Sequence, residues 1–142
     1  MIKSFRGKLA STDIRRIRLS TNDGLTGYKI VKFELLGVDG NNVYEAQVQV
    51  YSVKPSAATN LITFEDPTLL AAGIYQDSST NGILGDSQVV FDNMIINQDI
   101  FITYKETASS TAGINYHLEL EQVKLDLSEA TVATLKDMRG RE

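Results

Sequence analysis

His117 is the first residue to consider for catalysis or metal binding, because it is the one histidine of the chain. Its surroundings alternate: Tyr116 and Leu118 are apolar, whereas His117 and Glu119 are polar, which is the period of two that strands show. This phase places His117 beside Glu119 on the solvent face of a strand. A single histidine builds no histidine metal cluster and leaves one candidate base for a serine–histidine–acid triad. We therefore expect a solvated strand residue and predict no catalytic residue.

Carboxylates and glycines supply no stronger signal. Glu65 and Asp66 are a pair of a kind common on surfaces, and spacing alone brings no two carboxylates across a cleft. Neither 39–42 nor 77–86 matches an EF-hand calcium loop, although a calcium ion in loop 77–86 is an alternative. The run 82–85 lacks the lysine of a phosphate-binding loop. Since cysteine is also absent, we expect no cofactor, no metal and no enzymatic activity.

Aromatic side chains leave one ligand-binding alternative open. The chain has six tyrosines and no tryptophan, and most of the tyrosines fall in strand patterns. Packing in the core or in an interface is therefore the expectation. A sugar-stacking face built on loop tyrosines such as Tyr75 is the alternative. It would make the chain a carbohydrate- or receptor-binding β-sandwich module.

Charge is unevenly distributed along the 142 residues. Residues 1–36 hold eight basic and three acidic residues, whereas the remainder holds six basic and fifteen acidic ones. A basic end and an acidic body can pair within one molecule or head to tail between copies. The pI of about 5.0 argues against nucleic acid as a partner. No apolar run reaches the length of a membrane span, and the first residues lack a signal-peptide core, so we expect neither membrane insertion nor secretion.

Period-two patterns separated by turn residues recur through most of the chain and predict about eight or nine strands. Edge strands are expected at Ile2–Leu9 and at Ile14–Leu19, where three arginines blunt the edge. The remaining predicted strands are 28–36, 43–53, 61–64, 69–75, 87–91, 95–104 and 113–127. Val31, Phe33 and Leu35 are expected on one face of the strand over 28–36. The spacing predicts an all-β fold, a single antiparallel sandwich of the jelly-roll-like kind over residues 1–126.

Three local features refine this picture. An Asp-Gly turn within 39–42 predicts a β-hairpin between the strands over 28–36 and 43–53. The strand over 69–75 is apolar on both faces, so we expect it to be covered on each side, and 76–85 is expected to be a surface loop. Near Gln122 the alternation shifts by one residue, which requires a bulge, a bend or a change of sheet.

Residues 127–142 have the pattern of a short helical tail. Ser128 is the expected helix cap, and Leu127 and Val132 are placed to form a hydrophobic staple across it. Val132, Leu135 and Met138 line one side of the helix. A helix of about ten residues is unstable alone, so it must dock on its own sandwich or on a neighbouring copy. The candidate interface residues are Arg15, Arg16, Arg18, Leu127, Val132, Leu135 and Met138.

Several short segments together resemble small proteins encoded by marine tailed bacteriophages. The segments that carry the resemblance are Phe5–Leu9, Arg18–Phe33, Phe91–Asn93, Asn97–Ile102, Tyr116–Glu121 and Val132–Asp137. The resemblance covers most of the chain and brings no known site, so no functional residue is transferred from it. It implies a structural role in the virion, as a capsid decoration, vertex or tail-associated subunit.

The expected function is therefore that of a non-enzymatic phage structural protein acting through protein–protein interfaces. Its expected partners are further copies of itself and other virion proteins, and its expected location is the virion, after synthesis in the host cytoplasm. A glycan is the partner in the alternative interpretation.

Overall fold

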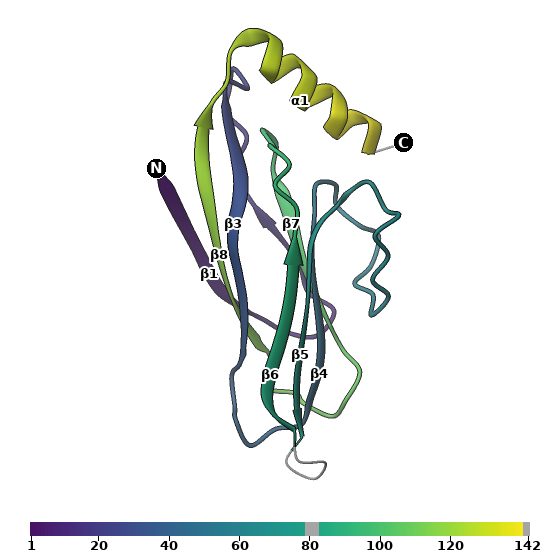
Figure 1. The fold of residues 1–142 in the computed structure, drawn as a ribbon. Helices are drawn as coiled ribbons and strands as arrows, with labels where there is room; N and C mark the ends of the chain where they lie inside the picture. Colours follow the sequence, from purple (N-terminus) through teal and green to yellow (C-terminus); the bar gives the residue numbers. More distant parts are fainter. Residues whose placement is uncertain (79–82, 141–142) are drawn as a thin grey trace.

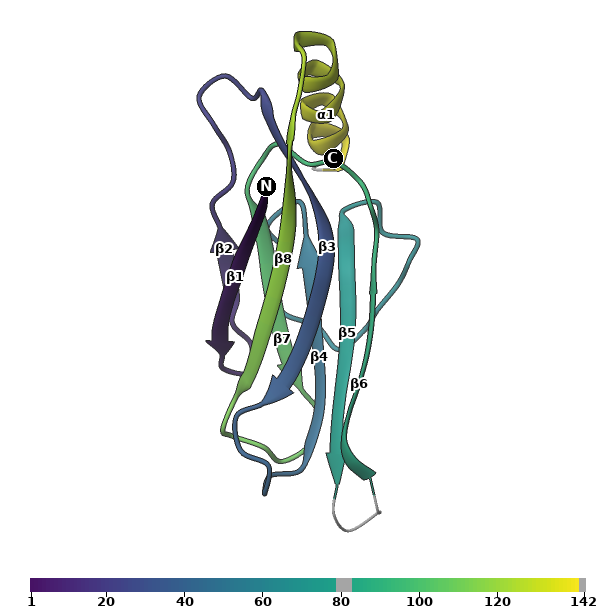
Figure 2. The same cartoon turned by 60° about the vertical axis from the view of Figure 1, so that its left-hand side comes forward.

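The computed structural model describes residues 1–78 and 83–140 and shows an elongated β-sandwich with a helix at one end (Figure 1). A three-stranded sheet, in the order β1-β8-β3, packs on a five-stranded sheet, in the order β2-β7-β4-β5-β6. All strand pairings are antiparallel. The predicted antiparallel sandwich with a short C-terminal helix is confirmed. Figure 2 shows β1 and β2 along one side of the sandwich and β6 along the opposite side.

The strands that were expected at sheet edges lie at sheet edges. β1 borders the three-stranded sheet and the short β2 borders the five-stranded sheet. The described elements are β1 (Ile2–Leu9), β2 (Ile14–Ile17), β3 (Thr26–Gly37), β4 (Tyr44–Tyr51), β5 (Leu69–Ser78), β6 (Ile83–Phe91), β7 (Ile100–Glu106), β8 (Ile114–Lys124) and α1 (Leu127–Gly140).

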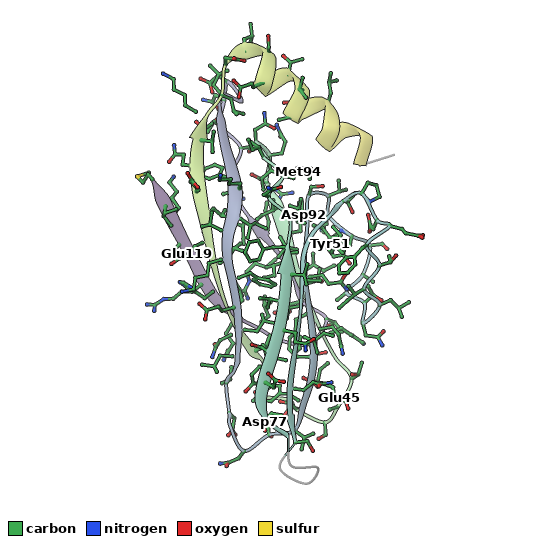
Figure 3. The ribbon with its side chains drawn as sticks, viewed as in Figure 1. Glu45, Tyr51, Asp77, Asp92, Met94 and Glu119 are labelled. Atoms are coloured by element: carbon green, nitrogen blue, oxygen red, sulfur yellow. The ribbon has the colours of Figure 1, made fainter. Side chains whose placement is uncertain are left out.

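β5 is covered on both faces, as its doubly apolar pattern predicted. Ala71 and Tyr75 belong to the main core between the sheets, whereas Leu69 and Ala72 form a second cluster on the outer face with Tyr51. Ile62 packs on this second cluster, so the connection over 52–68 lies across the outer face of the sheet, where Figure 3 shows Tyr51 directed. The strand predicted at 61–64 is wrong, because this segment serves as a cover and pairs with no strand.

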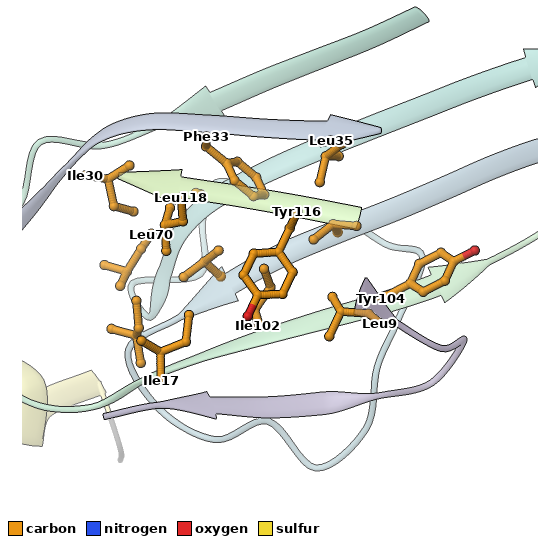
Figure 4. Close-up of a cluster of buried hydrophobic side chains, with 14 of the residues drawn as sticks. Leu9, Ile17, Ile30, Phe33, Leu35, Leu70, Ile102, Tyr104, Tyr116 and Leu118 are labelled. Atoms are coloured by element: carbon orange, nitrogen blue, oxygen red, sulfur yellow. The ribbon is translucent and has the colours of Figure 1, made fainter. Parts of the chain in front are cut away.

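The main core fills the space between the two sheets (Figure 4). β8 supplies Tyr116, Leu118 and Leu120, which are buried, while the residues between them are partly exposed. Phe33 of β3 packs into the same core. Full burial of a side chain of this size stabilises the fold by roughly 1.5–3 kcal/mol. The period-two alternation of β8 thus fixes which face of the three-stranded sheet packs inward.

The irregularity that the sequence predicts near Gln122 of β8 is found in β3, the strand that pairs with β8. The register between β3 and β8 shifts between Ile30 and Lys32, so Val31 is the extra residue of a β-bulge. Ile30 before the bulge and Phe33 after it are both buried, although their sequence parity differs. The prediction that Val31 shares a buried face with Phe33 is therefore wrong. On the other side of the bulge the β3–β8 ladder continues as far as the pair of Thr26 and Lys124.

The hairpin predicted across the Asp-Gly turn is also wrong. β3 belongs to the three-stranded sheet and β4 to the five-stranded sheet, so the connection crosses between sheets. Tyr44 holds this crossing in place: its hydroxyl donates to the Gly113 carbonyl oxygen at 2.8 Å and accepts from the amide groups of Val38 and Asp39. A turn sequence specifies a reversal of the chain but not the strand with which the next segment pairs.

The loop predicted over 76–85 is shorter than expected. Gln76 to Ser78 continue β5, and residues 83–85 begin β6, so a hairpin joins the two strands. Residues 79–82 lie outside the described residues. Backbone pairing satisfies the polar main chain in this segment whatever side chains it carries, which explains why polar composition misled the prediction.

The helix begins two residues earlier than predicted. Asp126, rather than Ser128, is the N-cap, because its Oδ1 accepts a hydrogen bond from the Glu129 amide at 2.8 Å. Leu125 and Ala130 then occupy the staple positions, and both are buried. The predicted staple between Leu127 and Val132 does not form, since both side chains are exposed.

Candidate functional site: exposed surfaces of the sandwich and the helix

His117 lies on the outer face of the three-stranded sheet, beside Glu119 as predicted. Arg6 of β1 and Glu34 of β3 stand at the same level on its two sides. The His117 Nδ1 atom is 3.8 Å from the Glu34 carboxylate, and Nε2 is 4.0 Å from Glu119. Arg6, Glu34 and His117, together with Asn115, line a shallow hollow of about 660 Å³. This hollow offers donors and acceptors to a polar ligand.

The six tyrosines are buried, each with at most 7% of its surface exposed. Tyr75 lies in β5 rather than in a loop, so the expectation of a loop tyrosine at this position is wrong. Burial raises the pKa of Tyr51, Tyr75 and Tyr104, which keeps their hydroxyl groups protonated. Core packing of the tyrosines is confirmed, and it removes the basis for a stacking face made of tyrosine.

The carboxylates do not gather into a site within the described residues. No group of three or more potential metal ligands is found there. Asp77 and Asp86, the ends of the candidate calcium loop, lie on the neighbouring strands β5 and β6, and 79–82 between them is outside the described residues. Gly85 packs under the Tyr75 hydroxyl, where a Cβ atom would lie 2.5 Å from the oxygen. A packing role thus accounts for this glycine.

Arg15, Arg16 and Arg18 lie on or next to β2, at the side of the sandwich. The Arg16 guanidinium is 3.8 Å from Asp99 and 5.3 Å from the centre of the Phe101 ring. Arg15 is 3.8 Å from Asp13, and Arg18 is exposed. The structure therefore holds Arg16 in place by local contacts, whereas Arg18 is available for an external partner.

Asp99 organises the chain just after β2. Its Oδ1 accepts hydrogen bonds from the amide groups of Leu19 at 2.9 Å and Ser20 at 3.0 Å. Partial burial raises the pKa of Asp99, but these hydrogen bonds and the nearby Arg16 outweigh burial and hold the pKa below its usual value. The carboxylate is thus a fixed structural anion that ties β2 to the start of β7.

α1 rests on the end of the sandwich through a narrow contact. Asn97, which is 1% exposed, donates through Nδ2 to the Ala130 carbonyl at 3.3 Å and to Thr134 Oγ1 at 3.0 Å. The same group also donates to the Gly24 carbonyl at 3.1 Å. Sequence reasoning missed Asn97, since an isolated asparagine in a connection carries no local signal of burial.

The apolar residues predicted on α1 point away from this contact. Leu127 is 76% exposed, Val132 51% and Leu135 49%. The side chain of Met138 is outside the described residues. Val132 also borders a groove of about 470 Å³ between α1 and the segment over 93–95, with Ile95 on its opposite wall. The apolar candidates lie at the end of the molecule and the arginines on its side, so the structure does not combine them into one patch (Figure 2).

Comparison with known proteins identifies no relative: no family model matches, and neither the curated proteins nor the solved structures contain a match. Within the described part of the chain, no helix has the length and apolarity needed to span a membrane.

Proposed function

We propose that the chain is a non-enzymatic structural subunit of a bacteriophage virion, acting through protein–protein interfaces as a capsid decoration, vertex or tail-associated protein. The main observation in support of this proposal is the exposure of the apolar residues Leu127, Val132 and Leu135 on α1. The resemblance of the chain to small proteins of marine tailed phages supports the viral assignment. Further copies of the chain and other virion proteins are the proposed partners, and the virion is its proposed location.

The helix is better suited to join a neighbour than to stabilise its own sandwich. Ala130 is the one fully buried apolar residue of α1 whose side chain is described. Its larger described apolar residues, Leu127, Val132 and Leu135, remain about half or more exposed, and covering each would contribute about 1 kcal/mol to an association. A partner that covers them and enters the adjoining groove would bury a continuous apolar surface.

Incorporation of variants into phage particles tests this proposal. Val132→Asp places a charge on the proposed interface, and we expect its content in purified particles to fall about tenfold or more relative to the unchanged chain. Thr131→Asp is the matched control, because this neighbouring residue is also exposed but is polar, and it should be incorporated normally. Equal incorporation of both variants would contradict the role of α1.

The polar hollow around His117 supports a second candidate function, a carbohydrate- or receptor-binding module. Arg6, Glu34 and Asn115 offer charged and amide groups at one place on an exposed sheet. A glycan array would show reproducible binding that Arg6→Ala and Asn115→Ala both abolish. Binding that persists in both variants, or no binding at all, would remove this candidate.

A further inference from the structure

The free edge of β6 has the properties of an acceptor for another strand. In the described structure β6 pairs with β5 alone and is the outermost strand of its sheet. Val90 and Phe91 are 55% and 37% exposed, and Asp86 is the one charged residue between Ile83 and Phe91. Edges that must stay unpaired are usually protected by lysine, proline or a bulge facing outward. β6 contains neither lysine nor proline, and its one register irregularity lies at its beginning, between Ile83 and Asp86, so the edge from Asp86 to Phe91 is regular.

The surface beside this edge is apolar and acidic. Phe64, Val90 and Phe91 line a groove of about 360 Å³ that Asp66 and Asp92 also border. Figure 3 shows Asp92 and Met94 close to each other, between the sandwich and α1. The sequence contains no lysine or arginine between Lys54 and Lys105, so neither β5 nor β6 contributes a basic side chain to this side of the sandwich. It therefore favours a partner that combines apolar and basic side chains.

The opposite side of the same molecule carries those side chains. β1 presents Arg6 and Lys8 outward, and Arg18 follows β2. Among the described residues, no ion pair involves any of these three side chains. Arg15 bridges the two strands, since a Cβ atom on Gly7 would lie 3.1 Å from its Nη1 atom. β1 and β2 thus form one continuous basic side.

Hydrogen bonding at both edges is compatible with direct pairing. The Met1 carbonyl accepts a hydrogen bond from the Gln122 amide. The amide and carbonyl groups of the odd-numbered residues of β1 therefore point to β8, and those of the even-numbered residues point to the free edge. The Asp92 amide donates to the Leu70 carbonyl, so between Asp86 and Phe91 the amide and carbonyl groups of the odd-numbered residues of β6 point to the free edge. Antiparallel pairing with Ile2 opposite Phe91 matches these free groups. It also sets two exposed apolar side chains, Ile2 and Phe91, side by side.

We propose that copies of this chain associate head to tail, with the basic β1–β2 side of one copy on the acidic β6 side of the next and β1 added antiparallel to β6. Within one molecule β1 and β6 run in opposite directions (Figure 1), so copies that stand side by side in the same orientation present them antiparallel. Pairing of like sides is disfavoured, because it opposes basic to basic or acidic to acidic residues. Such a heterologous contact builds a ring where the rotation closes and a filament where it does not.

This contact deepens the proposed function and rests on it only in that both describe an assembling subunit. Its test uses purified protein, so it can fail while the chain is still found in virions, and it can succeed where no virion contains the chain. The two failures are therefore distinguishable.

Reciprocal charge reversal followed by sedimentation velocity tests the contact. Arg6→Glu/Lys8→Glu places acidic residues on β1 opposite the acidic β6 side, and Asp86→Lys/Asp92→Lys places basic residues on the β6 side opposite the basic β1 side. We expect the unchanged chain to self-associate, each variant to associate at least about tenfold more weakly, and an equimolar mixture of the two variants to recover association. Lys54→Glu/Lys124→Glu is the matched control, since both lysines are exposed and lie outside the contact. Circular dichroism verifies that each variant is folded.

Engineered cysteines identify the paired strands. The chain has no cysteine, so Ile2→Cys and Phe91→Cys can be introduced into separate copies without competing thiols. Opposed residues in an antiparallel pair lie about 5.5 Å apart at Cα, within the range of a disulfide. We expect oxidation to link the two variants to each other. A monomeric unchanged chain at every soluble concentration, a mixture that fails to recover association, or efficient linkage of Phe91→Cys to itself would overturn the proposal.

Discussion

Asn97 is the single residue on which the position of α1 most depends. One side-chain amide serves the helix through Ala130 and Thr134 and the β2–β3 connection through Gly24. Removing it takes this donor from the Gly24 carbonyl and from Thr134, whereas the Ala130 carbonyl keeps the Thr134 hydroxyl as a donor, and the loss of a hydrogen bond of this kind costs about 0.5–1.5 kcal/mol. We predict that Asn97→Ala lowers the free energy of unfolding by this amount in denaturant titration and increases hydrogen exchange of the α1 amides. Asn93→Ala, at an exposed position nearby, should change stability by less than about 0.5 kcal/mol.

The stability of the fold depends on pH through the carboxylate of Asp99. Its folded-state pKa is lowered, so the stability that it contributes is present above its unfolded pKa and is lost as the pH falls through the folded value. We expect the amide signals of Leu19 and Ser20 to shift together in an NMR titration below about pH 4. Asp99→Asn should abolish that shift. A shift that persists in the variant would assign it to another carboxylate.

β3 and β5, which belong to different sheets, approach each other closely because β5 has a glycine, Gly73, at the contact. A Cβ atom on Gly73 of β5 would lie 2.8 Å from the Leu35 side chain of β3 and 3.0 Å from Val89 of β6. Gly73→Ala should therefore destabilise the fold by about 1–3 kcal/mol in denaturant unfolding. Gly40→Ala is the control, since no atom lies within 4 Å of the added methyl group. Equal stability of the two variants would show that the sheets can separate without cost.

The start of α1 depends on an aspartate rather than on a serine. The hydrogen bond from the Glu129 amide lowers the pKa of Asp126, so the charged cap is retained until the pH falls through the lowered value. We predict that Asp126→Ala reduces helix content, as measured by circular dichroism and by exchange of the first-turn amides. Ser128→Ala should leave both unchanged. A larger effect of Ser128→Ala would restore the cap expected from sequence.

Periodicity located most strands because it reports which side chains are buried, but it does not report pairing partners. The alternation in β1 and β8 placed both strands, and arginines marked β2 as an edge. The Asp-Gly turn after β3 predicted a hairpin that does not form, since Tyr44 and the neighbouring strands carry β4 into the other sheet. The polar end of β5 was missed because main-chain pairing, rather than apolar side chains, holds it.

The candidate functional surfaces were less predictable than the fold. The exposed apolar residues of α1 were identified from helical spacing, but their orientation away from the sandwich follows from the contacts of Asn97, a residue that no sequence pattern singles out. The edge of β6 was also missed, although the lack of basic residues between Lys54 and Lys105 is visible in the sequence. An edge is a property of sheet order, and sheet order is fixed by long-range contacts.

At the scale of the whole molecule, the sandwich has a basic side, an acidic side and an apolar end. This arrangement suits a subunit that repeats along a surface while its end contacts a different component. Quantitative mass spectrometry of purified phage particles tests that role most directly. We expect the chain to be present at a fixed number of copies per particle, in a constant ratio to the major capsid or tail protein. Its absence from purified particles would contradict the proposed function.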